Sequence, residues 1–223
     1  LRGTVVLLTA DHGEAFGEGY RYFAHGHTTT PEVAHVPMIL KAPGLSPGRN
    51  REIVHHVDVK PTLLELAGLK VPKKQQVDGV SLVPLLKGKS IPGRPLYWHY
   101  PHYGNQGGEP SSIITENDWK LIHSHEDGRD ELYHLGKDEV EQRDLAAAEP
   151  KRAKAMRAKL DAWLKATKAK MPVKDEKADL AKRKARFESL ATQGKERLER
   201  QHANFLNSNY QPNKDWWGSA PKD

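Results

Sequence analysis

Two short clusters near the start of the chain combine the side chains that bind metal ions and move protons. The first, Asp11-His12-Gly13, directly follows the apolar run Thr4–Ala10. Ligands in open α/β sheets bind where strands end, and a carboxylate beside an imidazole suits a divalent cation. A strand-end aspartate that caps a turn beside an unrelated histidine explains the same residues, and two ligands do not complete a metal site. The sequence leaves both interpretations open.

The second cluster, His25-Gly26-His27, lies in a loop rich in glycine and aromatic residues. In an extended backbone its two imidazoles project to one side, separated only by a glycine. Because histidine titrates near neutral pH, such a pair can neutralise a bound oxyanion or protonate a leaving group. The alternative is a solvent-exposed loop with two ordinary histidines.

A third candidate is the segment Tyr97–Gly108, in which aromatic and histidine residues run into a loop of glycine and amide residues. This composition is typical of a pocket wall that binds a polar ring such as a sugar. Its candidate substrate contacts are His99, His102 and Asn105. Alternating strand residues packed on a core explain the aromatic residues equally well.

The scaffold predicted for residues 1–90 is an α/β layer. Strands are expected at Thr4–Ala10, His35–Lys41 and Ile53–Asp58, and a helix at Val59–Leu69. The first run is continuously β-branched or aliphatic, which is typical of a strand buried on both faces of a parallel sheet. His55 and His56 fall inside the third strand and are expected to be structural.

Beyond a connection rich in proline and glycine, residues 70–95 with a helical turn at Ser81–Leu86, the pattern changes. Short strand candidates separated by turn residues predict an antiparallel meander at Leu96–Tyr100, Ser112–Thr115, Trp119–His125 and Glu131–Leu135. Apolar residues at helical spacing predict an amphipathic helix at Pro150–Lys170. A less regular helix with a break at Gly194 is expected over Asp175–Leu206. The expected parts are therefore 1–90, 91–171 and 172–223.

Composition excludes several kinds of site. The chain has no cysteine, so disulfides, thiolate zinc sites and thiol nucleophiles are absent. No apolar run is long enough for a transmembrane helix. The net charge of +6 arises in residues 149–206, which carry +9, whereas residues 1–148 carry −3 and eleven of the twelve histidines. Metal or acid–base chemistry is therefore expected in the acidic part.

Six segments resemble, in order and spacing, the C-terminal half of formylglycine-dependent sulfatases of the alkaline phosphatase superfamily. They are Thr9–Glu14, His35–Leu40 with Pro43-Gly44, Val57–Gly68, Asp78–Leu86, Asp118–Ile122, and Glu131–Leu135 continuing to Ala146. The resemblance covers residues 4–165. It implies an alkaline-phosphatase-like α/β domain, followed by a small antiparallel β subdomain with a packed helix and then a helical C-terminal extension.

The resemblance also implies roles for the first two clusters. In that family a calcium ion is held by carboxylates of the N-terminal half and by a strand-end Asp-Asn or Asp-His pair, which corresponds here to Asp11 and His12. The family places a lysine or histidine that contacts the sulfate shortly before the Val-Pro of the next strand. His25 and His27 bracket that position, and His25 fits the family's spacing slightly better.

One departure concerns the nucleophile, which in the family is a hydrated formylglycine made from cysteine or serine in a Cys/Ser-x-Pro-x-Arg motif. The only match to that spacing, Leu45–Arg49, begins with leucine, which cannot become an aldehyde. The chain also begins at Leu1 without an initiator methionine or a signal-peptide pattern. We therefore expect a fragment, inactive alone, whose nucleophile and at least two metal ligands lie upstream.

The function expected from the resemblance is hydrolysis of sulfate esters of small molecules or carbohydrates, with Ca²⁺ or another divalent cation polarising the sulfate and histidine assisting departure of the alcohol. An Asp-His pair keeps phosphate or phosphonate ester hydrolysis open. A basic module that binds nucleic acid or another polyanion is the weaker rival, because charge runs on helices are commonly solvated faces. No nucleic-acid partner and no membrane span are expected. The resemblance alone suggests a periplasmic or extracellular location.

Overall fold

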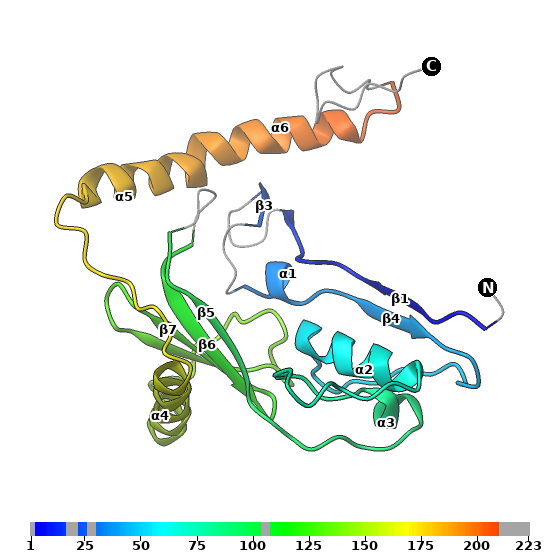
Figure 1. The fold of residues 1–223 in the computed structure, drawn as a ribbon. Helices are drawn as coiled ribbons and strands as arrows, with labels where there is room; N and C mark the ends of the chain where they lie inside the picture. Colours follow the sequence, from blue (N-terminus) through cyan, green and yellow to red (C-terminus); the bar gives the residue numbers. More distant parts are fainter. Residues whose placement is uncertain (1–2, 17–21, 26–29, 104–107, 210–223) are drawn as a thin grey trace.

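The computed structural model describes residues 3–16, 22–25, 30–103 and 108–209 (Figure 1). It is a mixed α/β structure with three antiparallel sheets. Two of them are two-stranded: β1 (Val6–Thr9) with β4 (Met38–Lys41), and β2 (Ala15–Phe16) with β3 (Tyr22–Ala24). The third has four strands. Within the described residues, no helix has the length and apolar character needed to cross a membrane.

The four-stranded sheet confirms the predicted meander. Its strands follow each other in chain order: β5 (Leu96–Tyr100), β6 (Ser111–Glu116), β7 (Trp119–Ser124) and β8 (Asp130–His134). Asn117 and Asp118 join β6 to β7 with φ angles of 48° and 60°. Two consecutive residues with positive φ make a turn whose twist matches the flanking strands, so this short turn fixes the register of the hairpin.

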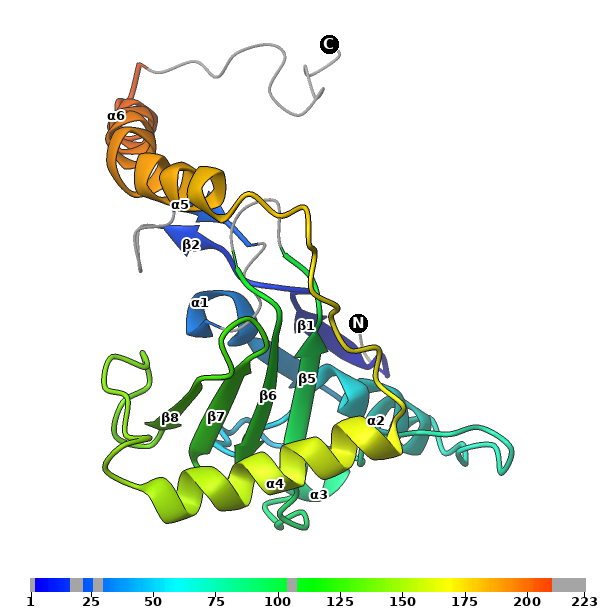
Figure 2. The same cartoon turned by 90° about the vertical axis from the view of Figure 1, so that its left-hand side faces the viewer.

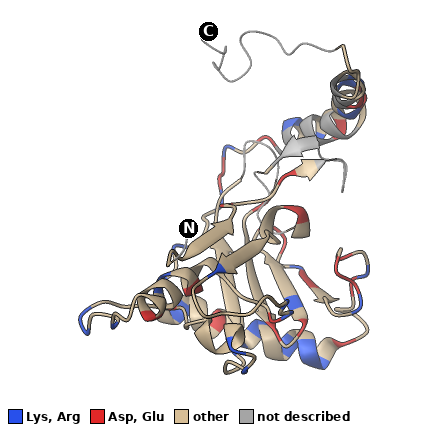
Figure 3. Cartoon of the chain, turned by 90° about the vertical axis from the view of Figure 1, so that its right-hand side faces the viewer, with Lys and Arg blue, Asp and Glu red and all other residues tan. Residues whose placement is uncertain are grey.

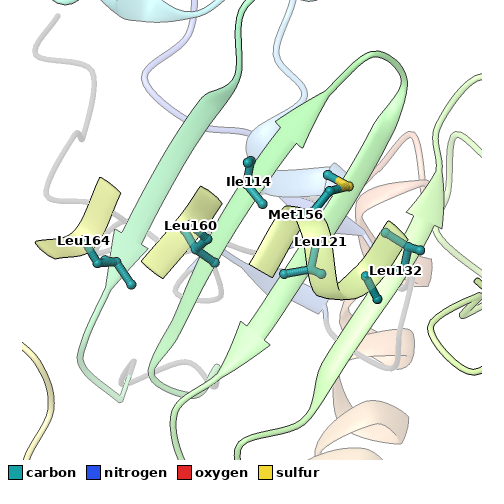
Figure 4. Packing of buried hydrophobic residues seen from close by; sticks show 7 residues of the cluster. Ile114, Leu121, Leu132, Met156, Leu160 and Leu164 are labelled. Carbon is teal, nitrogen blue, oxygen red and sulfur yellow. The ribbon is translucent and has the colours of Figure 1, made fainter. Parts of the chain in front are cut away.

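Helix α4 (Pro150–Ala166) covers one face of this sheet (Figure 2). Its buried residues, at helical spacing, meet the apolar residues of β6, β7 and β8 in one core made of Ile114, Leu121, Leu132, Ala153, Met156, Leu160 and Leu164 (Figure 4). The helix ends before the predicted Lys170. Thr167 Oγ1 donates to the Trp163 carbonyl at 2.9 Å, and Lys168 turns the chain with a φ of 52°.

The predicted strand Ile53–Asp58 is wrong, because the chain there forms a 3₁₀ turn, η2 (His56–Asp58), that leads into α2 (Val59–Leu66). The backbone N–H of His55 donates to Asp58 Oδ2 at 2.9 Å, and the N–H of Val57 donates to His55 Nδ1 at 3.2 Å. These side chains satisfy local donors that a strand would direct to a neighbour, and they start a helix instead.

The predicted burial of Thr4–Ala10 in a parallel sheet is also wrong. β1 pairs antiparallel with β4, and the described residues supply neither strand with a second neighbour. Leu8 is 56% exposed and Ile39 is 62% exposed. The apolar run does form a strand, but among the described elements no layer covers both of its faces.

Asp58 joins this first part of the chain to the four-stranded sheet. Its side chain is fully buried, accepts the backbone N–H of Val80 at 2.9 Å and forms an ion pair with Arg94, which precedes β5. Thr62 Oγ1 accepts the N–H of Leu82 at 2.9 Å, just before α3 (Val83–Leu86). α2, α3 and the approach to β5 are therefore held together by polar contacts.

The C-terminal extension is helical, as predicted, with α5 (Leu180–Ser189), a π-helical segment, η3 (Leu190–Gly194), and α6 (Lys195–Phe205). The irregularity ends at Gly194, the predicted break. α6 contacts β3. Basic residues occur in several elements and are interspersed with acidic ones (Figure 3), which is typical of a solvated surface.

Candidate functional site

The Asp-His-Gly turn follows β1 and is held against α1 (Pro31–Ala34). The N–H of Gly13 donates to the Val33 carbonyl at 2.8 Å, and a Cβ at Gly13 would lie 1.9 Å from the Glu32 carbonyl oxygen. Only glycine allows this approach. The turn therefore presents Asp11 and His12 on its outer side, with the Asp11 side chain 89% exposed.

Asp11 and His12 are close enough to share one cation, because Asp11 Oδ2 lies 3.7 Å from His12 Nε2. The N–H of His12 donates to Asp11 Oδ1, and this bond keeps the pKa of Asp11 below its usual value, so the carboxylate is charged at neutral pH. Calcium takes six to eight ligands, mostly oxygens. The pair fits a cation site but supplies only part of its coordination.

The β2–β3 hairpin brings His25 to this pair. Ala15 is paired with Ala24, so Glu14 and His25, the next residues outward, face each other. His25 Nδ1–H donates to Glu14 Oε2 at 2.9 Å, and its ring stacks on His12 with centroids 4.4 Å apart and planes 18° apart. His27 lies outside the described residues. The structure thus brings together Asp11, His12 and His25.

Glu14 is the site residue that sequence reasoning missed. One donor atom each from His12, Glu14 and His25 lies within 4.8 Å of the other two. The sequence shows Glu14 only as one residue of a family-like segment. Its position opposite His25 depends on the hairpin register, which the residues by themselves do not reveal.

His55 and His56 connect the end of β1 with β5. Thr9 Oγ1 lies 3.5 Å from His56 Nε2, and the His55 ring lies 4.8 Å from that of Trp98. Burial lowers the pKa of His55, which therefore stays neutral at neutral pH. The structural role predicted for these two histidines now has specific contacts, and through them the β1 end meets the face of β5 that carries Trp98.

Along β5, Tyr100 shares the Trp98 face, and its ring meets that of His102 edge-on at 5.7 Å. Asn105 lies outside the described residues. The aromatic segment therefore contributes His102 and two rings to the side of β5 that faces the first part of the chain.

His99 occupies the opposite, α4-facing side of β5. Its Nε2–H donates to the Lys170 carbonyl at 2.8 Å, and its Nδ1 lies 2.7 Å from Ser112 Oγ. His125 Nε2 also lies 2.7 Å from Ser112 Oγ. Burial, together with the neighbouring His123 and His99, lowers the pKa of His125 to about 4. Both ring nitrogens of His99 are engaged, and its side chain lies on the opposite face of β5 from Tyr100, the residue whose ring His102 contacts.

Comparison with known proteins identifies the family. Residues 19–170 match the family model described as N-sulphoglucosamine sulphohydrolase, C-terminal. The chain belongs to this sulfatase family. The match begins within the loop that carries His25 and His27, and it includes the four-stranded sheet and α4. The helical extension lies beyond it. The family resemblance read from the sequence motifs is therefore confirmed.

Members of the sulfatase family with assigned activities are similar to this chain. A sulfatase of Formosa agariphila is 37% identical over 147 residues, covering 58% of this chain and 27% of the relative. The Delta 4,5-hexuronate-2-O-sulfatase of Bacteroides thetaiotaomicron is 31% identical over 180 residues, covering 75% of this chain and 36% of the relative. This chain thus spans about a third of the length of these sulfatases.

Solved structures share the fold. A protein in complex with its substrate D-glucosamine-2-N,6-O-disulfate has a TM-score of 0.60 at 27% identity, over 78% of this chain and 36% of that one. The phosphonate monoester hydrolase of Agrobacterium radiobacter has a TM-score of 0.54 at 25% identity, over 74% of this chain and 35% of that one. The α/β architecture expected from the sequence is confirmed.

Proposed function

We propose that this chain is the C-terminal portion of a sulfatase that hydrolyses sulfate esters of carbohydrates. The observation that carries the proposal is the contact between His25 and the Asp11-His12 pair, within a chain of the sulfatase family. A cation-binding pair beside a histidine suits hydrolysis of a sulfate ester, in which the cation binds the sulfate oxygens and the histidine protonates the departing alcohol. The hexuronate sulfatase and the glucosamine disulfate complex support a sulfated carbohydrate as the substrate class.

Within this mechanism Asp11 and His12 would hold the cation, which would polarise the sulfate. Calcium is the expected ion, and the remaining ligands and the formylglycine nucleophile are assigned to the part of the sulfatase outside this chain. Glu14 accepts the Nδ1–H of His25 and so fixes the ring beside Asp11 and His12. We assign to His25 the contact with the sulfate and the transfer of a proton to the departing alcohol. His27 is the second candidate for that role.

Substrate contact is assigned to His102 and Asn105, which follow β5 in the sequence. Trp98 and Tyr100 share one face of β5 and supply apolar surface for a sugar ring. The prediction that His99 contacts substrate receives no support from its placement, since both of its ring nitrogens bond within the sheet and to Lys170. We therefore assign His99 to the internal hydrogen-bond network.

Phosphonate or phosphate ester hydrolysis is the second candidate, and the similarity to phosphonate monoester hydrolase favours it specifically. Both reactions need a cation, a nucleophile and a proton donor, and this chain contributes equally to either. The two proposed functions differ in the substrate that they prefer. The decisive assay therefore compares kcat/KM of the whole protein on a sulfate ester and on the matched phosphonate ester.

The test uses the whole protein that contains this chain, with Asp11→Ala, His25→Ala and His27→Ala variants and His35→Ala as an exposed control. Asp11→Ala should lower both bound calcium and turnover, because the cation loses a charged ligand. The histidine substitution that removes the sulfate contact should leave calcium content unchanged and lower kcat/KM about 10²–10³-fold. His35→Ala should behave as the unsubstituted protein.

Three results would contradict the proposal. One is preference of the whole protein for phosphonate over sulfate esters. Another is full activity of both His25→Ala and His27→Ala. The last is hydrolysis of an aryl sulfate by residues 1–223 alone, since the proposed nucleophile is not in this chain.

A further inference from the structure

His12, Glu14 and His25 form a cluster whose composition differs from that of a calcium site. Two imidazoles and one carboxylate each offer a donor atom, and these atoms lie within 4.8 Å of one another. Calcium prefers a shell of oxygens, whereas imidazole nitrogens favour zinc, copper and nickel. We propose that these three residues bind a divalent transition-metal cation, with Zn²⁺ as the representative ion, through a donor set that shares His12 with the calcium pair but uses Glu14 and His25 in place of Asp11.

The tautomer of His12 is set for metal binding. Its Nδ1–H donates to the Gly13 carbonyl at 2.8 Å, so Nε2 carries the lone pair. A backbone carbonyl that accepts one ring N–H and leaves the other nitrogen for the ion is the usual support of a metal-binding histidine. Gly13 is itself fixed by its hydrogen bond to Val33. The first donor is therefore held in place by the backbone.

The carboxylate of Glu14 supplies the second donor. Oε2 accepts the Nδ1–H of His25, and Oε1 is buried and has no hydrogen-bond partner among the described residues. A buried carboxylate oxygen without a partner is unfavourable, and a cation is one group that satisfies it. Glu14 precedes the fully buried Ala15, so its backbone is anchored beside the ion.

The third donor, His25, is placed by the hairpin register and by its stacking on His12. A tetrahedral zinc ion with bonds of about 2.0–2.1 Å needs donors about 3.3 Å apart. Side-chain rotations must therefore bring the most distant pair closer by about 1.5 Å, starting from the 4.8 Å limit. Three protein donors leave a fourth position open to water or an anion.

A consequence of this inference rests on the proposed function. A transition-metal ion at the cluster would occupy His12 and His25 together, and so remove both the cation ligand and the proton donor assigned to the sulfatase reaction. Zn²⁺ should therefore inhibit the whole protein even with calcium in excess, and Glu14→Gln should weaken that inhibition, since Glu14 ligates only the transition metal.

The direct test titrates residues 1–223 with Co²⁺, whose visible absorption reports tetrahedral coordination, and then displaces it with Zn²⁺. One equivalent should bind. His12→Ala, Glu14→Gln and His25→Ala should each weaken binding at least about tenfold, because each removes one of three protein donors. Millimolar Ca²⁺ should not displace the Co²⁺. His35→Ala removes an exposed histidine outside the cluster and should bind Co²⁺ normally.

Glu14→Gln is the decisive variant, because it keeps the size of the side chain and a polar contact to His25; circular dichroism checks that it folds. Lack of tetrahedral Co²⁺ absorption, or binding that needs Asp11 (tested with Asp11→Asn) but not Glu14, would overturn the inference. Because this titration measures no turnover, a whole protein without sulfatase activity would contradict the proposed function alone. Equal Zn²⁺ inhibition of Glu14→Gln and the unsubstituted protein would overturn the inhibitory consequence.

Discussion

The strands of the β1–β4 ladder are more apolar than those of the four-stranded sheet, yet the ladder is the less buried of the two. Leu121 and Leu132 of the sheet are fully buried beneath Leu160 of α4. Leu8 and Ile39 of the ladder are largely exposed. Apolar sequence therefore specified strands in both regions, but burial required a second layer, which only α4 provides within the described chain.

The comparison also separates stability from function. The candidate site lies at the end of β1, beside the poorly covered ladder, while the best-packed region contributes His102 and the aromatic wall. This chain spans about a third of the length of its relatives. We infer that the exposed ladder face is covered by further elements in a longer protein of this length. In this chain by itself, substitutions in the sheet core and in the ladder should therefore change the free energy of unfolding by very different amounts.

The largest effect is expected in the sheet core. Leu160→Ala should lower the free energy of unfolding by about 4 kcal/mol, since a fully buried leucine leaves a cavity among packed neighbours. Urea unfolding followed by the fluorescence of Trp119 and Trp163, both packed on this core, measures it. Leu69→Ala, at an exposed leucine, is the control and should change the value by less than about 0.5 kcal/mol. Equal effects would show that the core is not the stabilising unit.

The next effect tests the connection between the two regions. Asp58→Ala leaves Arg94 without its buried partner and should cost about 3 kcal/mol. Hydrogen exchange should show faster opening in α2 and α3, with the sheet still protected. Asp78→Ala, at an exposed carboxylate, should leave exchange unchanged. Equally faster hydrogen exchange in the sheet after Asp58→Ala would mean that the two regions do not unfold separately.

A smaller effect is expected on acidification of the sheet. The folded-state pKa of His125 is about 4, below the ordinary 6.5, so the unfolded chain binds more protons between these values and stability falls as the pH drops from 6.5 to 4. The loss should be about 1 kcal/mol, because partial exposure screens the ring. Urea midpoints at several pH values measure it. His125→Gln should flatten the profile in that window, and His102→Asn should not.

The smallest effect on this chain is expected at the ladder. Leu8→Lys should change its unfolding free energy by less than about 0.5 kcal/mol, because the site is exposed. In the whole protein the same substitution should destabilise by at least about 2 kcal/mol if that face is covered, since it would bury an unpaired charge. Val173→Lys, at an exposed valine beyond the family match, is the control in both proteins. Indifference of the whole protein would contradict coverage of the ladder.

Much of the fold was predictable where local chemistry agrees with the final structure. The spacing of Ala153, Met156, Leu160 and Leu164 predicts α4 and its buried face, and Asn117-Asp118 predicts the tight turn of the sheet. At Ile53–Asp58 the apolar pattern predicts a strand, but the chain forms a 3₁₀ turn, because the side chains of His55 and Asp58 cap a helix start. The hydrogen bonds that these two side chains accept from the local backbone favour the turn over a strand.

The candidate site divides in the same way. The sequence by itself determined the Asp11-His12 pair after a strand, since an apolar run followed by polar residues and glycine ends a strand in any context. It also determined that a loop carrying His25 and His27 follows this pair. Only the tertiary structure decided that Glu14 faces His25, that His25 stacks on His12, that His99 bonds to Lys170 and that His102 contacts the ring of Tyr100. Strand register and sheet coverage set these relations, and both depend on residues far apart in the chain.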